Sequence, residues 1–147
     1  MGYALFAQRK LVLDSQLNSA QLQQTQRSNE QYKLANDSLG LKQELGSLQA
    51  SQALELADLY QELASAGSEQ QRASIQGDID AMKQRHTAEL DSINRDIYVL
   101  GVKENAVEME VKALDTQVTA LQKQLEAVEE AEGKAIDRAT PKFNGVG

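Results

Sequence analysis

The sequence predicts an all-α protein, folded as a long antiparallel helical hairpin of coiled-coil type with an extended C-terminal tail. Its 147 residues suit one domain and are rich in Gln, Leu, Ala, Glu and Lys, which favour helices. Proline is absent before position 141. Apolar residues recur with alternating spacings of three and four over nearly six heptads in the second half, which is typical of a coiled coil.

The first arm of the hairpin is expected over about residues 4–65, with a seam that is only partly apolar. With Tyr3 taken as heptad position a, the d positions are mostly apolar and the a positions mostly polar. Further along, the register shifts to Leu56, Leu59 and Leu63. The glutamine-rich stretch 21–31 fits two alternatives, a solvated helix surface or a seam in which glutamines hydrogen-bond across to the other helix.

The turn is expected at residues 65–69. Gly67 suits the left-handed conformation that ends many helices. Ser68, followed three residues later by Gln71, fits a capping box that begins the next helix. Two arms of about 60 residues would each span roughly 90 Å at 1.5 Å per residue.

The second arm, about residues 69–138, carries the strongest pattern. With Leu90 as position a, eleven of the twelve a and d positions are large and apolar, and Glu104 is the exception. Upstream, Ile75, Ile79, Met82, His86 and Leu90 follow a 4-3-4-4 spacing, a stutter that locally unwinds a supercoil. The predicted seam is Leu90, Ile93, Ile97, Leu100, Val107, Val111, Leu114, Val118, Leu121, Leu125 and Val128.

A second apolar stripe runs along the opposite face of this arm. It is formed by Val99, Val102, Ala106, Met109, Ala113 and Ala120, with Tyr98 beside them. A two-helix hairpin leaves such a stripe in water, so we expect another chain or a folded-back arm to cover it. The predicted assembly interface is Tyr98, Val99, Val102, Ala106, Met109 and Phe143.

A compact four-helix bundle is the alternative fold. It would need breaks at residues 36–40 and at Gly101, which lie at similar heights in the hairpin. Two seam charges, Arg27 and Glu104, would also lie at similar heights if the hairpin mirrors about residues 65 and 66. They either pair, which would fix the register, or each extends independently into solvent.

The last residues, 141–147, are expected to form an extended tail outside the helical domain 1–140. Pro141 blocks helix continuation, and Asn144-Gly145 favours a turn. Phe143 is either part of a free end or an aromatic anchor on a neighbouring subunit.

The amino-acid composition excludes several kinds of catalytic and metal-binding site. Without cysteine there is no disulfide, thiol nucleophile or cysteine-ligated metal, and one histidine, His86, cannot build a His-based metal site alone. We therefore expect no enzyme activity, cofactor or metal. A net charge of -7 and six aromatic residues argue against nucleic-acid binding. No Sec signal or transmembrane segment is recognisable, so we expect a cytoplasmic protein or one exported without a cleaved signal.

These observations favour a non-enzymatic structural protein that self-assembles through helical packing into a homo-oligomer or polymer, with a filament subunit as one form. The architecture is similar to the helical-hairpin subunits of bacterial filaments, such as flagellin cores and type III secretion needles. This similarity lies in the hairpin and the composition, not in a motif. The alternative is a cytoplasmic coiled-coil adaptor, chaperone or scaffold that binds another protein.

Overall fold

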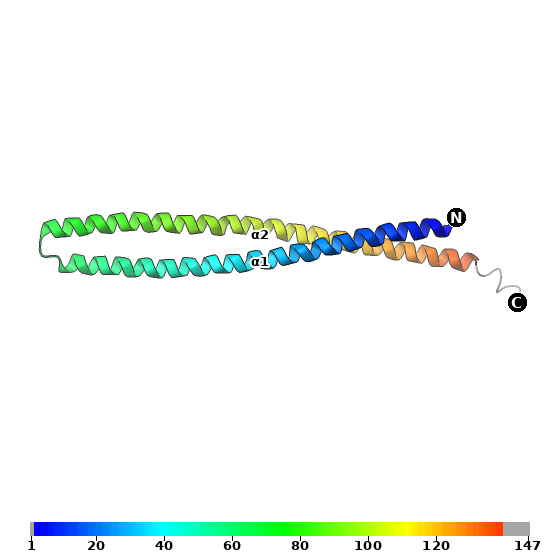
Figure 1. Cartoon of the computed structure of the whole chain (residues 1–147), viewed down its shortest axis with the longest axis horizontal. Coiled ribbons are helices and arrows are strands. Elements are labelled where there is room, and N and C mark those ends of the chain that lie inside the picture. Colours follow the sequence, from blue (N-terminus) through cyan, green and yellow to red (C-terminus); the bar gives the residue numbers. More distant parts are fainter. Residues whose placement is uncertain (1, 140–147) are drawn as a thin grey trace. The chain divides into compact units, whose positions relative to one another are not determined.

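The protein folds into two helices that pack against each other in antiparallel orientation, as the computed structural model shows (Figure 1). Helix α1 spans Gly2–Ser65 and helix α2 spans Glu69–Ala139. The structure describes residues 2–139, and the side chains of residues 4–138. Of the described residues 98% are helical and none lies in a strand. The predicted all-α hairpin is therefore confirmed, whereas residues 141–147 lie outside the described part.

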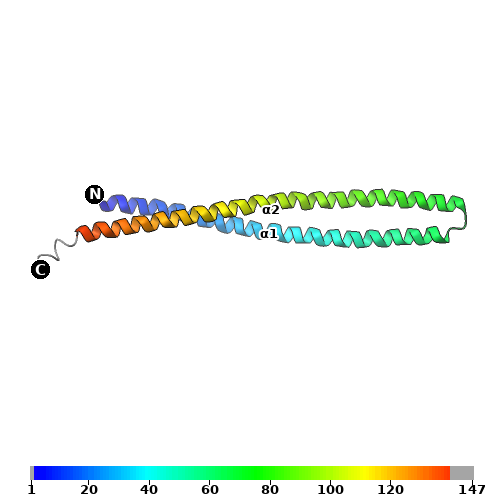
Figure 2. The ribbon, with the colours of Figure 1, turned by 180° about the vertical axis from the view of Figure 1, so that it is seen from behind.

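The four-helix alternative does not form. Helix α1 continues without a break through residues 36–40, and α2 continues through Gly101 (Figure 2). A Cβ added at Gly40 or Gly101 would meet nothing within 4 Å, so neither glycine marks a close approach. Helix-favouring neighbours and the seam on either side outweigh the weak propensity of single glycines, which cost only about 1 kcal/mol each in a helix.

The capping of α2 is built by the two residues that the sequence indicates. The backbone N–H of Gln71 donates to Ser68 Oγ at 3.1 Å. The Gln71 side chain reaches back as in a capping box, but its Oε1 accepts from the N–H of Gly67, at 3.1 Å, instead of from Ser68. This pair of bonds satisfies two backbone donors at the entry to α2.

The expectation of a left-handed Gly67 is wrong. No described glycine has a positive φ. At the end of α1, the N–H of Ala66 bonds to the carbonyl of Leu63 at 3.3 Å, which tightens the last turn. Because the N–H of Gly67 is taken by the Gln71 side chain, the turn closes without the backbone bonds of a left-handed cap.

The contacts divide the chain into two units. Unit 1 comprises residues 1–31 and 106–147, and unit 2 comprises residues 32–105. Each unit therefore contains one stretch of α1 and one stretch of α2, and each is described by itself below.

The core of unit 1 is a single row of side chains from each helix. Leu13 and Ala20 of α1 form a buried cluster with Val118, Leu121 and Val128 of α2. Ion pairs and hydrogen bonds flank this row. Lys10 Nζ lies 3.5 Å from Glu129 Oε1, and the Gln24 amide donates to the Asp115 carboxylate. The predicted seam residues of this unit are buried (Val107, Leu114, Val118, Leu121, Val128) or half-buried (Val111, Leu125).

The core of unit 2 is thinner. Ile79 is the one fully buried large side chain among the described residues, and Met82 next to it in the row is half-buried. The spacing of buried and half-buried positions from Ile75 to Leu90 reproduces the stutter that the sequence indicates. The predicted seam residues of this unit, Leu90, Ile93, Ile97 and Leu100, are all half-buried.

Truncating Leu114 to alanine is expected to lower the free energy of unfolding by about 2–5 kcal/mol, because the change opens a cavity in the row that holds unit 1 together. Leu114 is only 9% exposed, whereas Leu54 is 70% exposed. Leu54→Ala is the matched control and should change the free energy by less than about 0.5 kcal/mol. Urea unfolding followed by circular dichroism measures both. Equal effects of the two substitutions would contradict the described packing.

Candidate functional site

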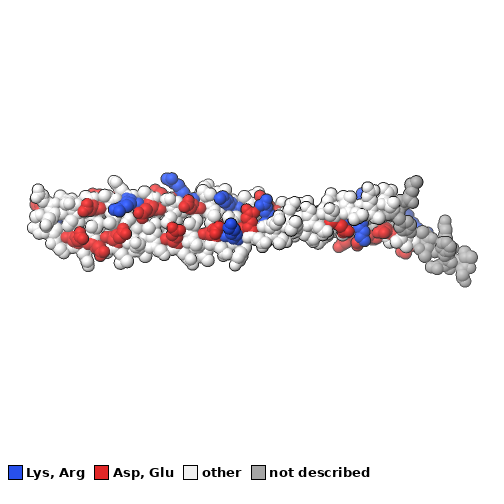
Figure 3. All heavy atoms as spheres, in the orientation of Figure 1, with Lys and Arg blue, Asp and Glu red and all other residues white. Residues whose placement is uncertain are grey.

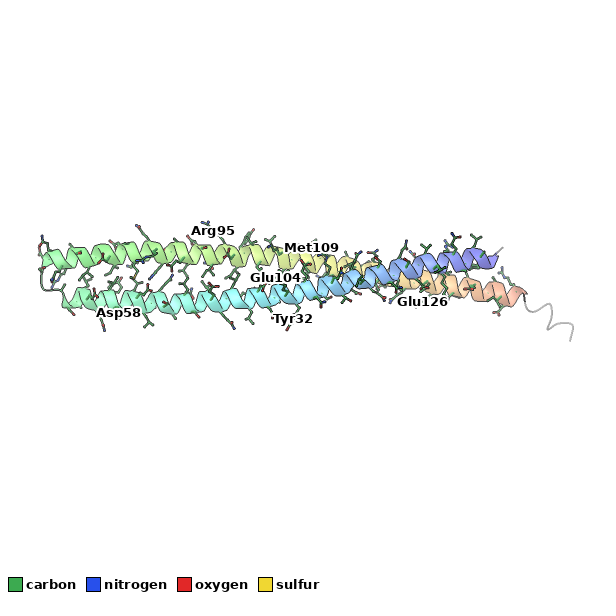
Figure 4. All side chains as sticks on the ribbon, viewed as in Figure 1. Tyr32, Asp58, Arg95, Glu104, Met109 and Glu126 are labelled. Carbon is green, nitrogen blue, oxygen red and sulfur yellow. The ribbon has the colours of Figure 1, made fainter. Side chains whose placement is uncertain are left out.

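The predicted assembly residues lie on the outer surface of α2. In unit 2, Tyr98 is 73% exposed, Val99 50% and Val102 52%. In unit 1, Ala106 is exposed and Met109 is 72% exposed. Figure 4 shows Met109 pointing away from α1. Phe143, the sixth predicted residue, lies outside the described part of the chain.

Large apolar side chains are exposed on both helices of unit 2, but only on α2 are several of them adjacent. Tyr98, Val99 and Val102 follow one another within a turn and a half of helix, and we call them the α2 patch. On α1, the residues exposed singly are Tyr32, Leu39, Leu54 and Tyr60. Scattered apolar residues are normal on protein surfaces, whereas a continuous group in contact with water is typical of an interaction site.

A buried polar layer interrupts the seam of unit 2. Gln52 of α1 and His86 of α2 are each only 6% exposed, and they are the two polar residues found buried among those described. Gln52 Nε2 donates to the backbone carbonyl of His86, at 3.3 Å, and to Glu89 Oε2, at 3.2 Å. His86 Nε2 lies 3.0 Å from Glu55 Oε2. The layer thus ties the two helices together through three polar contacts.

Two polar atoms in this unit are buried without a partner in the described chain. They are His86 Nδ1 and Glu104 Oε1. Figure 4 shows Glu104 on the side of α2 that faces α1. Buried polar atoms without a partner reduce stability, so the seam of unit 2 is held less strongly than an all-apolar row would be.

The alternative of an Arg27–Glu104 pair is wrong. In unit 1, Arg27 Nε lies 2.7 Å from Glu110 Oε2, and Arg27 Nη1 lies 2.6 Å from Glu30 Oε2. The hydrogen bond to Glu30, and then the negative charge of Glu110, raise the pKa of the Arg27 guanidinium. The pairs Gln24–Asp115 and Arg27–Glu110 put the mirror point of the hairpin near residue 69, so Arg27 meets a residue beyond Glu104.

The glutamine-rich stretch is mainly helix surface. Gln21, Gln23 and Gln26 are exposed, whereas Gln24 is half-buried and donates to Asp115 across the seam. Thr25 Oγ1 donates to the carbonyl of Gln21, at 3.1 Å, within the same helix. One glutamine, Gln24, therefore bridges the helices, as the second alternative proposes. Gln31 is half-buried, and the other three glutamines face solvent.

Potential metal ligands do not cluster in the part of the chain that the structure describes. No group of three or more potential ligands among His, Asp and Glu lies together there. Within residues 2–139, neither helix contains a segment long and apolar enough to span a bilayer. No family model, curated protein or solved structure matches the chain.

Replacing the polar layer with leucines, as Gln52→Leu/His86→Leu, is expected to raise the free energy of unfolding by about 1–4 kcal/mol, because the layer then no longer buries the unpaired Nδ1 atom of His86. The same variant should lose its unique register, because a leucine fits beside any apolar neighbour. Urea unfolding measures the first effect. Distances between spin labels at positions 49 and 87 measure the second.

Proposed function

We propose that the protein is a non-enzymatic structural subunit that self-associates, with other copies of the chain covering the outer face of α2. The observation that carries this proposal is the exposure of the α2 patch in unit 2, where Tyr98, Val99 and Val102 are each at least half exposed. Removing apolar surface from water yields about 25 cal/mol per Å², so an uncovered patch of this kind favours association.

The composition supports a helical subunit over a globular binding domain. A chain with 4% aromatic residues and thin seams has little interior in which to enclose a small molecule. Its two helices, of 64 and 71 residues, instead present a large surface on which other copies of the chain could pack. A filament is one polymer that such packing would form.

The substitution Val102→Glu is expected to raise the concentration at which half of the chains associate by about tenfold or more, because the contact would then bury an unpaired carboxylate. Sedimentation velocity over a wide concentration range measures this. Leu54→Glu is the matched control, since it also replaces an exposed apolar residue of unit 2 with a charge but lies outside the patch. Met109→Glu tests the outer face of unit 1 in the same way.

Two results would contradict the proposal. A parent chain that stays monomeric at every concentration would exclude self-association and would favour the alternative, an adaptor or scaffold for another protein. If the parent chain assembles and the Val102→Glu and Leu54→Glu variants assemble equally well, the α2 patch is not a contact between copies.

A further inference from the structure

A belt without charged side chains surrounds part of unit 1. In α1, the twelve residues 15–26 include no Asp, Glu, Lys or Arg, and in α2 the seven residues 116–122 include none either, although 25% of the whole chain is charged. The two stretches lie side by side, because Ala20 packs in one cluster with Val118 and Leu121. We call them together the neutral belt. On the face shown in Figure 3, this part of unit 1 is largely free of charge.

The exposed side chains of the belt are amides, hydroxyls and a few apolar groups. Ser19 and Gln26 of α1 and Gln117 of α2 are exposed, as are the apolar side chains of Leu22, at 61%, and Ala120. An amide or a hydroxyl both donates and accepts hydrogen bonds, so such a surface is complementary to another of the same kind. A carboxylate or ammonium group is not self-complementary in this way.

The fold of the hairpin does not explain the belt. The intramolecular seam at this level is made by other side chains, Leu17, Ala20, Val118 and Leu121. The outer positions of a soluble two-helix structure are free to carry charges, which keep copies apart and the protein in solution. Elsewhere in unit 1 the outer positions do so, as in the i,i+4 pairs Glu108–Lys112 and Glu130–Lys134.

The distribution of charged residues over unit 1 indicates which kind of partner can bind the belt. A partner of opposite charge would be drawn to the acidic segment 126–132 of α2, which has four glutamates, and not to the neutral belt. A second copy carries the same charges at the same positions, so two copies aligned in parallel and in register bring like charges together at most levels of unit 1. At the belt they do so least, because neither stretch of the belt carries a charge of its own and Asp115, at its edge, is bonded to Gln24.

We infer that the neutral belt of unit 1 packs against the neutral belt of a second copy of this chain, through hydrogen bonds between amide and hydroxyl side chains around Leu22 and Ala120. This inference rests on the proposed function and adds the surface at which copies meet. The α2 patch in unit 2 is a separate surface. A chain with two separate contacts to its copies can grow into an open polymer instead of closing as a dimer.

Charge substitutions within the belt test the inference. One variant, Ser19→Glu/Gln26→Glu, places two negative charges on the exposed side of α1, and a second, Ser19→Lys/Gln26→Lys, places two positive charges there. Each variant alone should raise the concentration for half association by about tenfold, because like charges then face each other between copies. An equimolar mixture of the two should associate at the parent's concentration or below, because opposite charges then meet.

A matched control uses unit 2. Gln43→Glu/Ser47→Glu adds the same charge to exposed positions of α1 in a region that already carries Lys42 and Glu44. It should associate like the parent. Circular dichroism and sedimentation velocity are measured for every variant, and helix content should stay at the parent's value because all four positions are exposed.

The outcomes separate this inference from the proposed function. If the parent does not associate at all, both are wrong. If the parent associates and the Glu and Lys variants do so equally well, the belt is not a contact and only the inference is overturned. If each variant associates poorly and the mixture is not restored, or if only one sign of charge weakens association, the belt does not meet the belt of a second copy.

Discussion

Two helices can cover only one side of each other, and the organisation of this protein depends on that constraint. Each helix has one stripe of side chains that its partner removes from water, and everything outside that stripe remains on the surface. The burial pattern of α2 follows this limit closely. From Ile75 to Val128 the buried and half-buried positions are spaced by three and four, apart from Gly101, which is half-buried beside Leu100. Any other apolar group on the same helix, such as Tyr98 and Val102, must remain exposed unless another molecule covers it.

The polar residues of the seam set a second limit, because they reduce the stability that the single stripe can provide. In unit 2, Gln52 and His86 occupy core positions and bond across the helix pair, and Glu104 is half-buried with one oxygen unpartnered. Polar groups of this kind can fix one register at a cost in stability. Unit 1 has the larger buried apolar cluster, built on Leu13, Val118 and Leu121.

The heptad pattern from Leu90 onward predicted a coiled coil, and the break at residues 65–69 predicted that the chain folds back on itself as a hairpin. The capping of α2 by Ser68 and Gln71 was also readable, since it depends on residues three apart in the chain. The pairing of Arg27 with Glu110 could not be predicted from the sequence. The choice between Glu104 and Glu110 depends on where the hairpin has its mirror point, near residue 69, and local patterns do not determine that point. The Gln52–His86 layer was missed for the same reason. The layer does leave a signal in the sequence. On each helix, the seam positions before and after the layer residue, Gln52 or His86, are both four residues away from it.

Hydroxyl-radical footprinting is the most direct test of the claim that other copies cover the outer face of α2. Tyr98 and Met109 are both reactive toward such radicals and largely exposed, whereas Met82 is half-buried in the intramolecular seam. The account predicts that oxidation of Tyr98 and Met109 falls as the pure protein is concentrated, while oxidation of Met82 stays constant. Unchanged oxidation of Tyr98 and Met109 at every concentration would contradict it.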